Sequence, residues 1–349
     1  MNNNNPASIS IIIPCRNEED FIVECLNSII SNDLSTDGIE IVVVDGMSED
    51  RTRRYVRKYS KNYPCIKLLD NPQKNTSTAL NIGIKESNGN YIMILSSHSK
   101  VEKNFIKTNI DNLEKNAADC VGGVMITIPA NNTLLAQAIA LTLSHPFGVG
   151  NSYFRIGSKE LKYVDTVPFG CYKKEIFENI GYFDENLVRN QDIEFNLRLK
   201  KASGKILLNP NIISYYYARP NLKDLFKQNF SNGFWVIYSL KFAKLPFSIR
   251  HLVPFTFVFS LLSSFTASLV YFPFFYLLAF IISLYLISNI SFSIELSIKN
   301  GFKCLPWLVL TFFTLHFSYG LGSLWGIVKI IMSKFRIIYD SLIHLYQIN

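Results

Sequence analysis

Short apolar runs alternate with amphipathic segments along the first hundred residues. The apolar runs are rich in β-branched residues and are typical of buried strands; they lie at Ser8–Pro14, Ile39–Val44, Ile66–Leu69 and Tyr91–Leu95. The segments between them carry apolar residues on one helical face, at residues 17–30, 50–59 and 76–86. Strands that alternate with helices predict an α/β fold, with a mostly parallel sheet that helices cover on both faces.

Helical and strand-like patterns continue to about residue 245. Further helices are expected at 103–117, 130–144, 174–180 and 222–243, and further strands at 119–128, 164–172 and 205–208. We expect a break in the strand at 119–128, at Gly122-Gly123, and a cap on the strand at 205–208, formed by Asn209-Pro210. Pro146–Arg155 has the composition of a glycine-rich loop.

After residue 250 the chain becomes almost continuously apolar. Three runs stand out, at Leu252–Tyr271, Phe272–Ser293 and Leu305–Met332. The first two carry no charge, and each is about long enough to cross a bilayer core of roughly 30 Å. Runs of this length favour membrane spans over the alternative, a buried helical domain.

Basic residues flank the apolar runs and predict their orientation. They are Lys241, Lys244 and Arg250 before the first run, Lys299 and Lys303 before the third, and Lys334 and Arg336 after it. The positive-inside tendency makes the first two groups cytoplasmic. A third crossing would then put the last group outside, so either the third run is re-entrant or split, or the charge bias fails there.

Composition narrows the classes of partner. The 349 residues carry a formal net charge of +8, which suits a phosphorylated substrate or an anionic membrane surface. Basic runs with interleaved aromatic residues are lacking, so nucleic acid is not an expected partner. The six cysteines form no CxxC pair, and we expect buried thiols in a reducing compartment. The start, MNNNNPAS, lacks the pattern of a cleavable signal, so the first domain is expected to be cytosolic.

Polar residues follow the predicted strands where the strands end. These strand ends are Pro14-Cys15-Arg16, Asp45-Gly46 and Ser96-Ser97-His98. Ligands of parallel α/β sheets bind at the carboxyl ends of the strands. We therefore expect Arg16, Asn17 and Glu18 to face a ligand, and Asp45 to accept a hydrogen bond from a ribose hydroxyl or a base N–H. The alternative for Asp45 is a helix cap.

A second candidate site lies in the stretch Asp184–Arg198, which reads DENLVRNQDIEFNLR. Asp192 and Glu194 stand where an amphipathic helix begins. A carboxylate there stays ionised beside the positive end of the helix dipole, and it can accept a proton from an incoming hydroxyl. Asp192 is thus a candidate general base; the alternative is an ordinary acid in the first turn of a helix.

Several segments together resemble a known family. SIIIPCRNEEDFIVECLNSI, IEIVVVDGMSEDRT and ALNIGIKESNGNYIMIL resemble the inverting family 2 glycosyltransferases with the GT-A fold. SHPFGVGNSYFR, VDTVPFGCYKKEIFENIGYFDENLVRNQDIEFNLRL and LKDLFKQNFSNGFWVIYSLK resemble the branch of succinoglycan-type exopolysaccharide glucosyltransferases. The resemblance covers a GT-A domain at 8–245. Composition adds a disordered tail at 1–7, two to three transmembrane helices at 252–332 and a tail at 333–349.

The resemblance implies roles for individual residues. The nucleotide-sugar-binding residues would be Pro14, Arg16, Glu18, Asp45, Asn81, Ser96 and His98. Asp192 matches the catalytic base, with Gln191 where many members have a second acid. The residues that close over the diphosphate or face the acceptor would be Gln228, Trp235, Asp165 and the Gly148–Arg155 loop, the alternative for the last two being a plain structural turn.

The sequence departs from the family at the end of the fourth strand. Members usually have Asp-x-Asp there, which holds a divalent ion on the sugar diphosphate, whereas this chain has Ser96-Ser97-His98. His98 is either a ligand of a divalent cation (Mn²⁺ or Mg²⁺) or a direct phosphate contact. Weak metal dependence is one expected consequence.

The resemblance implies an inverting, membrane-associated glycosyltransferase of surface or exopolysaccharide biosynthesis. Its donor would be a nucleotide sugar and its acceptor a lipid-linked glycan. It would be a multi-pass protein of the cell (inner) membrane with a cytoplasmic catalytic domain. Two alternatives stay open, a polyprenyl-monophosphate sugar transferase and an inactive relative that keeps the fold.

Overall fold

The computed structural model describes residues 9–33, 38–241 and 248–348. The chain forms two compact units. The first holds residues up to Ile128 together with Ser152–Tyr217, and the second holds Pro129–Asn151 and the residues from Ala218 onward. The tail predicted at 1–7 and the basic residue Lys244 lie outside the described residues. The predicted domain limits at 245 and 252 stay a prediction.

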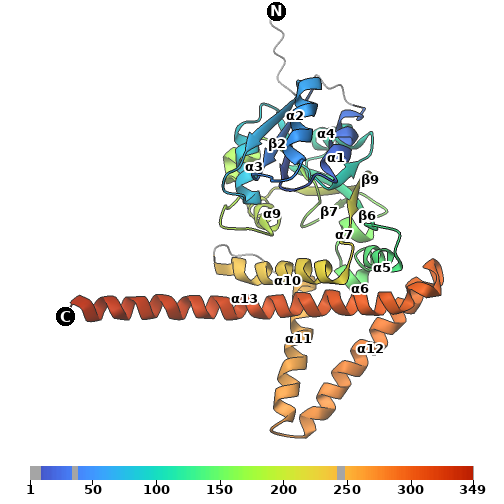
Figure 1. The fold of residues 1–349 in the computed structure, drawn as a ribbon, viewed down its shortest axis with the longest axis vertical. Coiled ribbons are helices and arrows are strands. Elements are labelled where there is room, and N and C mark those ends of the chain that lie inside the picture. The colour runs from blue at the N-terminus through green and yellow to red at the C-terminus, as the bar shows by residue number, and fades with distance from the viewer. Residues whose placement is uncertain (1–8, 34–37, 242–247, 349) are drawn as a thin grey trace, which may run out of the picture. The chain divides into compact units, whose positions relative to one another are not determined.

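One mixed sheet forms the centre of the first unit, in the order β3-β2-β1-β4-β8-β6-β9-β5, with β7 paired to β9 (Figure 1). Its first four strands are parallel and follow the predicted runs: β1 (Ile9–Cys15), β2 (Ile39–Asp45), β3 (Ile66–Asp70) and β4 (Tyr91–Ile94). Cys15 lies opposite Asp45, and Asp45 opposite Asp70. The carboxyl ends of these strands are therefore level, at one edge of the sheet.

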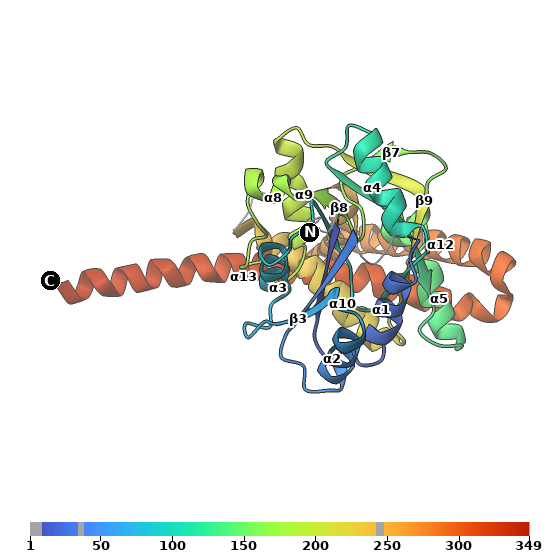
Figure 2. The same cartoon turned by 90° about the horizontal axis from the view of Figure 1, so that it is seen from above.

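Side chains that alternate along the strands bury two separate faces. Ile11 and Ile13 pack in one core with the helices α1 (Ile22–Ile30), α2 (Thr52–Asn62) and α4 (Phe105–Lys115). Ile12 packs in the other core with α3 (Thr76–Lys85), α8 (Glu175–Ile180) and α9 (Gln191–Lys201). Figure 2 shows α3, α8 and α9 along one side of the strands and α1 and α4 along the other. This confirms the predicted α/β fold with helices on both faces.

The second half of the sheet departs from the sequence-based expectation. It contains β5 (Ser99–Val101), β6 (Cys120–Ile128), β7 (Lys162–Tyr163), β8 (Cys171–Lys173) and β9 (Ile206–Tyr217). The strand expected at 164–172 is wrong: only β7 and β8 form, and a loop joins them. Pro168 and the left-handed backbone of Phe169, with φ 50°, interrupt the run. β8 instead lies antiparallel between β4 and β6.

β9 passes through the expected cap at Asn209-Pro210 and continues to Tyr217, so that prediction was also wrong. Gly122 of β6 pairs with Leu208 and Val124 with Ile213, so residues 209–212 form an irregularity in the ladder. Pro210 lies within it and therefore removes no ladder hydrogen bond. The expected break at Gly122-Gly123 is a shift of register with β9, while β6 itself runs unbroken through both glycines. A Cβ atom on Gly123 would lie 1.8 Å from the carbonyl oxygen of Ile212.

The second unit is helical. It contains α5 (Leu134–Thr142), α6 (Pro146–Val149), α10 (Leu222–Tyr238), α11 (Ile249–Ser268), α12 (Pro273–Asn300) and α13 (Leu305–Ile348). The loop expected at Pro146–Arg155 instead holds two short helices, α6 and, in the first unit, α7 (Tyr153–Ile156). His145 accepts a hydrogen bond from the N–H of Phe147, and Pro146 stands at the first helical position, so α6 has the signals of a helix start.

Three helices of this unit are long and apolar enough to cross a membrane: Arg250–Ser268, Pro273–Asn300 and Phe302–Ser333. They differ in burial within the protein. Only 11% of the most apolar window of each of the first two is buried, against 50% of that of the third. In Figure 1, α11 and α12 form a hairpin and α13 runs across it.

Small residues bring α13 close to its neighbours. A Cβ atom on Gly322 would lie 2.0 Å from the carbonyl oxygen of Phe230 on α10, and one on Gly320 would lie 2.3 Å from that of Pro254 on α11. Helices cross this closely where a glycine leaves room for the facing backbone. A larger share of the third apolar run is therefore packed on protein than of the other two.

Glu40 on β2 gives the first unit a pH-dependent contribution to stability. The buried carboxylate accepts hydrogen bonds from Ser10 Oγ, Lys67 Nζ and both nitrogens of Asn88. Burial alone would raise the pKa of Glu40, but these hydrogen bonds, led by that of Lys67, outweigh it and hold the pKa below its ordinary value. The folded state thus favours the ionised form.

We expect Glu40→Gln to lower the free energy of unfolding at pH 7 by about 2 kcal/mol. Because the folded pKa is depressed, the wild type has this stability above the unfolded pKa of about 4.3 and loses it as the pH falls further. The difference between the two proteins should therefore shrink on acidification. Thermal unfolding in detergent across a pH series measures it, with the exposed Glu86→Gln as control. A difference that stays constant down to pH 3 would contradict the prediction.

Candidate functional site

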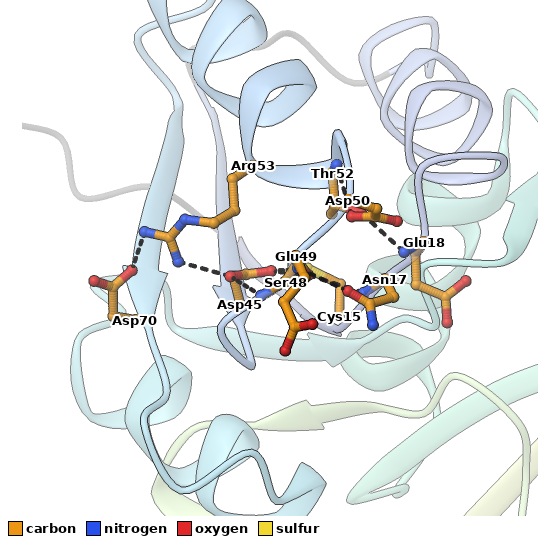
Figure 3. A network of polar contacts seen from close by, with 10 residues as sticks. All are labelled: Cys15, Asn17, Glu18, Asp45, Ser48, Glu49, Asp50, Thr52, Arg53 and Asp70. Atoms are coloured by element: carbon orange, nitrogen blue, oxygen red, sulfur yellow. Dashed lines mark hydrogen bonds and ion pairs between the residues drawn. The ribbon is translucent and has the colours of Figure 1, made fainter.

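The loops that follow β1 and β2 are joined by reciprocal hydrogen bonds (Figure 3). The N–H of Asn17 donates to Ser48 Oγ at 2.8 Å, and Asn17 Oδ1 accepts from the N–H of Glu49 at 2.9 Å. The N–H of Glu18 donates to Thr52 Oγ1 at 2.8 Å. Asn17 has a φ of 55°, which an asparagine tolerates better than most residues. The two loops therefore form one rigid rim at the carboxyl edge of the sheet.

Asp45 lies beneath this rim and is completely buried. Arg53 Nη1 donates to Asp45 Oδ2 at 2.7 Å, and Arg53 Nη2 donates to Asp70 Oδ1 at 2.7 Å. Ser48 donates to Asp45 through both its N–H and its hydroxyl. Figure 3 shows Arg53 between the two carboxylates. In this arrangement Asp45 holds the loop and Arg53 in place, and its oxygens already have protein donors.

The remaining residues predicted at the first two strand ends lie at the rim. Pro14 is half-buried within β1, opposite Val44. Arg16 is exposed, and the stem of its side chain packs over Gly46, where an added Cβ would lie 3.3 Å from Arg16 Cβ. The strand ends predicted from sequence are thus brought together, with Arg16 as the exposed cation.

Ser96 and His98 follow β4 and face the loop after β1. His98 Nδ1 lies 3.3 Å from Glu18 Oε1, and His98 Nε2 lies 3.3 Å from Ser96 Oγ. The imidazole also packs against Phe21 and Tyr216, with ring centroids 6.3 and 5.3 Å away. The structure therefore brings together three predicted residues, Glu18, Ser96 and His98.

This cluster supplies few ligands for a divalent cation. Among the described residues, no three His, Cys, Asp or Glu side chains are grouped so that they could hold a metal ion. Glu18 and His98 offer one carboxylate and one imidazole, whereas Mg²⁺ prefers six oxygen ligands. The protein side chains therefore fit such an ion only as minority ligands, with phosphate oxygens and water completing the set.

Asp192 lies in the first turn of α9, as predicted, and its side chain is exposed. Asn196, one helical turn further on, accepts a hydrogen bond from the Tyr172 hydroxyl on β8 at 2.9 Å and donates to Thr166 Oγ1 at 3.0 Å. Residues four apart share a helix face, so Asp192 faces the same side as Asn196. Burial raises the pKa of the Tyr172 hydroxyl, with Cys120 and the charge of Asp192 adding to it. The carboxylate is thus open to solvent and close to the sheet.

An arginine that sequence reasoning missed fixes α9 in place. Arg198 donates to both carboxylate oxygens of Glu194, at 2.7 and 2.9 Å, and to the carbonyl oxygens of Ile180 and Tyr182. The guanidinium thereby supplies donors to carbonyl groups at and just after the end of α8, where no further helical N–H group can reach them. Glu194, the second acid of the predicted pair, is therefore a positioning residue.

Asn81 is likewise committed to protein partners. Its side chain donates to the carbonyl oxygen of Phe183 and to Glu185 Oε1, and accepts from the N–H of Phe183, each at 2.9 Å. It connects α3 to the loop that leads to Asp192. Its predicted place near a diphosphate stays a prediction.

The other predicted residues are dispersed. Asp165 is exposed on the loop between β7 and β8, and Gln191 is half-buried beside Asp192, with its Oε1 atom lacking a partner among the described residues. Gln228 and Trp235 belong to α10 in the second unit, two helical turns apart and so on one face.

The sequence offered little indication that Arg53 and Arg198 hold the site together. Both look like ordinary arginines on a helix surface, and their acidic partners cannot be identified from sequence alone.

Comparison with known proteins gives consistent results. The model of the glycosyl transferase family 2 matches residues 10–181. A protein of Methanococcus voltae, named dolichyl N-acetyl-alpha-D-glucosaminyl phosphate 3-beta-D-2,3-diacetamido-2,3-dideoxy-beta-D-glucuronosyltransferase, is 33% identical over 92% of this chain and 97% of its own length. The succinoglycan biosynthesis protein ExoA of Rhizobium meliloti is 28% identical over 65% of this chain and 68% of its own.

A solved structure shares the fold. The mannosyltransferase PcManGT from Pyrobaculum calidifontis, in complex with GDP-Man and Mn²⁺, superposes with a TM-score of 0.57 at 16% identity, over 91% of this chain and 87% of that one. At this level of identity the likeness concerns the fold alone.

Proposed function

Because the chain belongs to glycosyl transferase family 2, we propose that it moves a sugar from a nucleotide diphosphate sugar to a hydroxyl group of a lipid-linked glycan. Membership of the family makes it a glycosyltransferase with the GT-A fold, as the resemblance predicted. The donor, the acceptor and the roles of single residues are the proposed part. The observation that carries them is the exposed carboxylate of Asp192 at the start of α9, on the face that Asn196 attaches to the sheet.

In the proposed reaction, an acceptor oxygen attacks the anomeric carbon of the donor as Asp192 takes the proton of that hydroxyl. The bond between the anomeric carbon and the diphosphate oxygen breaks with its electron pair leaving on the nucleoside diphosphate. Attack and departure take place on opposite faces of the sugar, so the configuration inverts. Asp192 begins ionised and ends protonated, and solvent restores it.

The departing diphosphate carries negative charge that the site has to stabilise. A divalent cation bound with the diphosphate would supply part of this stabilisation, and Glu18 and His98 are the side chains that would hold it. Arg16, exposed over Gly46 at the rim, would supply a further positive charge.

The apolar helices support a lipid-linked acceptor. We infer that the hairpin of α11 and α12 crosses the membrane, whereas α13, half of whose apolar window is buried on protein, lies across the hairpin without crossing. The basic residues on both sides of the third run would then stand on one side of the membrane, which removes the conflict with the positive-inside tendency. That side would be the cytoplasmic one, with the catalytic unit.

The relative from Methanococcus, which aligns along nearly its whole length, is named for transfer to a sugar already attached to dolichyl phosphate. That name favours glycan extension over the alternative, transfer of a sugar to the lipid phosphate itself. It also makes a uronic acid one candidate for the transferred sugar.

Transfer by the purified full-length protein in lipid nanodiscs tests the proposal. Radiolabelled nucleotide sugars and a lipid extract that contains polyprenyl-linked glycans are incubated with Mn²⁺ or with EDTA. We expect label in an organic-extractable product one sugar longer than its acceptor, and slower transfer in EDTA. A labelled product with a single sugar on the lipid phosphate would overturn the choice of acceptor. Absence of transfer from every donor, with an active relative as positive control, would overturn the proposed reaction.

A further inference from the structure

Arg155, on the short helix α7 of the first unit, has an unusual environment. Its guanidinium carbon lies 5.6 Å from the ring centroid of Phe154 and 5.7 Å from that of Tyr216, distances typical of cation–π contacts. A ring contact supplies no hydrogen-bond acceptor to the N–H groups along the edge of the guanidinium, so these groups require other partners.

No acid meets that edge within the part of the chain that the structure describes. The guanidinium of Arg155 has neither an ion pair nor a hydrogen bond there, and its Nη1 atom is buried without a partner. Arg53 and Arg198 show the usual pattern, since each is bound to carboxylates. Burial lowers the pKa of the Arg155 guanidinium, an effect that Tyr216 offsets only in part. Such a buried, unpaired cation is costly unless a ligand supplies the anion.

Tyr216 connects Arg155 to the loop after β4. Tyr216 of β9 lies opposite Ser99 of β5, the residue that follows His98 in the chain. The ring of Tyr216 also contacts the imidazole of His98. This is the loop in which Ser96 replaces the acid expected from the family resemblance. Glu18 is the acid that remains beside His98, and no described acid pairs with Arg155, so the edge of the guanidinium is open to an anionic ligand.

We propose that Arg155 binds an anionic pair of oxygens on the donor substrate. A planar guanidinium presents two parallel N–H groups that match either a phosphate or a carboxylate. Two parts of a donor have this chemistry, the diphosphate and the C6 carboxylate of a uronic acid sugar. On the diphosphate, Arg155 would add a fixed positive charge to that of the divalent cation proposed above; on a uronate, it would select the sugar. This inference rests on the proposed function, because it requires a nucleotide sugar as donor.

Binding measurements on the full-length protein test the assignment. Isothermal titration calorimetry with UDP, GDP, UDP-GlcNAc, GDP-mannose and UDP-glucuronate is run on the wild type, Arg155→Gln and Arg155→Lys, with the exposed Arg54→Gln as matched control. We expect Arg155→Gln to weaken donor binding at least about tenfold and Arg155→Lys to weaken it less, since lysine keeps the charge but loses the planar fork. Arg54→Gln should bind as the wild type does.

The ligands distinguish the two sources of the anion. If Arg155 binds the diphosphate, Arg155→Gln should weaken the binding of UDP or GDP by the same factor as the binding of the matching nucleotide sugar. If Arg155 binds a uronate, Arg155→Gln should weaken the binding of UDP-glucuronate and leave the binding of the other four ligands unchanged.

Thermal unfolding without ligand separates binding from packing. Removing a cation that has ring contacts but no ion pair within the described residues should leave the melting temperature of Arg155→Gln within about 3 °C of the wild type. A lower melting temperature with unchanged donor affinity would assign Arg155 to packing and overturn this inference alone. A wild type that binds none of the five ligands would overturn the proposed function, and the inference with it.

Discussion

Asp192→Asn is expected to slow sugar transfer about a thousandfold while it leaves donor binding intact. Asparagine has nearly the same shape as aspartate but cannot accept the proton of the attacking hydroxyl. A positioned general base contributes about 10²–10⁴ in rate, so turnover should fall about a thousandfold. Because the side chain is exposed in the first turn of α9, the amide adds no buried unpaired group and should not disturb the fold.

Three measurements make this prediction specific. Initial rates of transfer give the fall in turnover, titration with the preferred donor gives the dissociation constant, and thermal unfolding reports the fold. Glu178→Gln, which replaces another exposed acid of the same unit, on α8, is the matched control and should retain full activity. Turnover of the asparagine variant within a few fold of the wild type would remove Asp192 from the reaction.

The sequence predicted those parts of the fold that depend on local pattern. β1, β2 and β4 are largely buried on both faces, so their apolar runs are recognisable without any knowledge of their neighbours. The start of α9 was placed to within a residue of Asp192, because acids in the first turn are a local signal. The level ends of parallel strands then brought Arg16, Asp45 and His98 to one edge of the sheet.

Features that depend on distant partners were missed. β9 continues through Pro210 because four of its residues form an irregularity opposite Gly123, and the sequence of β9 does not record the pairing with β6. The long apolar run of α13 resembles a membrane span, yet the packing of Gly322 against Phe230 depends on where α10 lies. Hydropathy measures the composition of a helix and not the surface on which it packs.

The site shows the same division. Candidate ligand-binding residues were found by their places at strand ends. The sequence could not show which of them already form hydrogen bonds with other protein groups. Asp45 is bound by Arg53 and Ser48, and Asn81 by Phe183 and Glu185. Arg155, by contrast, was predicted only as the last residue of a loop that faces the acceptor, and its distinction is that its guanidinium has no acidic partner among the described residues.

Arg53→Leu is expected to destabilise the first unit by about 3–5 kcal/mol. Asp45 is completely buried, so loss of Arg53 leaves an ionised carboxylate without its counter-charge, which is the costly way to break a buried ion pair. The second contact of Arg53 adds little, because the side chain of Asp70 is 55% exposed and water screens the pair. Arg54→Leu makes the same change at the neighbouring, exposed position of α2 and should cost less than about 0.5 kcal/mol.

The double variant Arg53→Leu with Asp45→Asn separates the lost attraction from the stranded charge. If the cost arises mainly from an uncompensated carboxylate, removing that charge should restore a large part of the stability, and the double variant should be more stable than Arg53→Leu alone. Urea unfolding of Arg53→Leu, Asp45→Asn, the double variant and the wild type in the same detergent gives the four free energies. A double variant less stable than Arg53→Leu would contradict this explanation. It would mean that the carboxylate of Asp45 stabilises the loop after β2 through Ser48 even when Arg53 is absent.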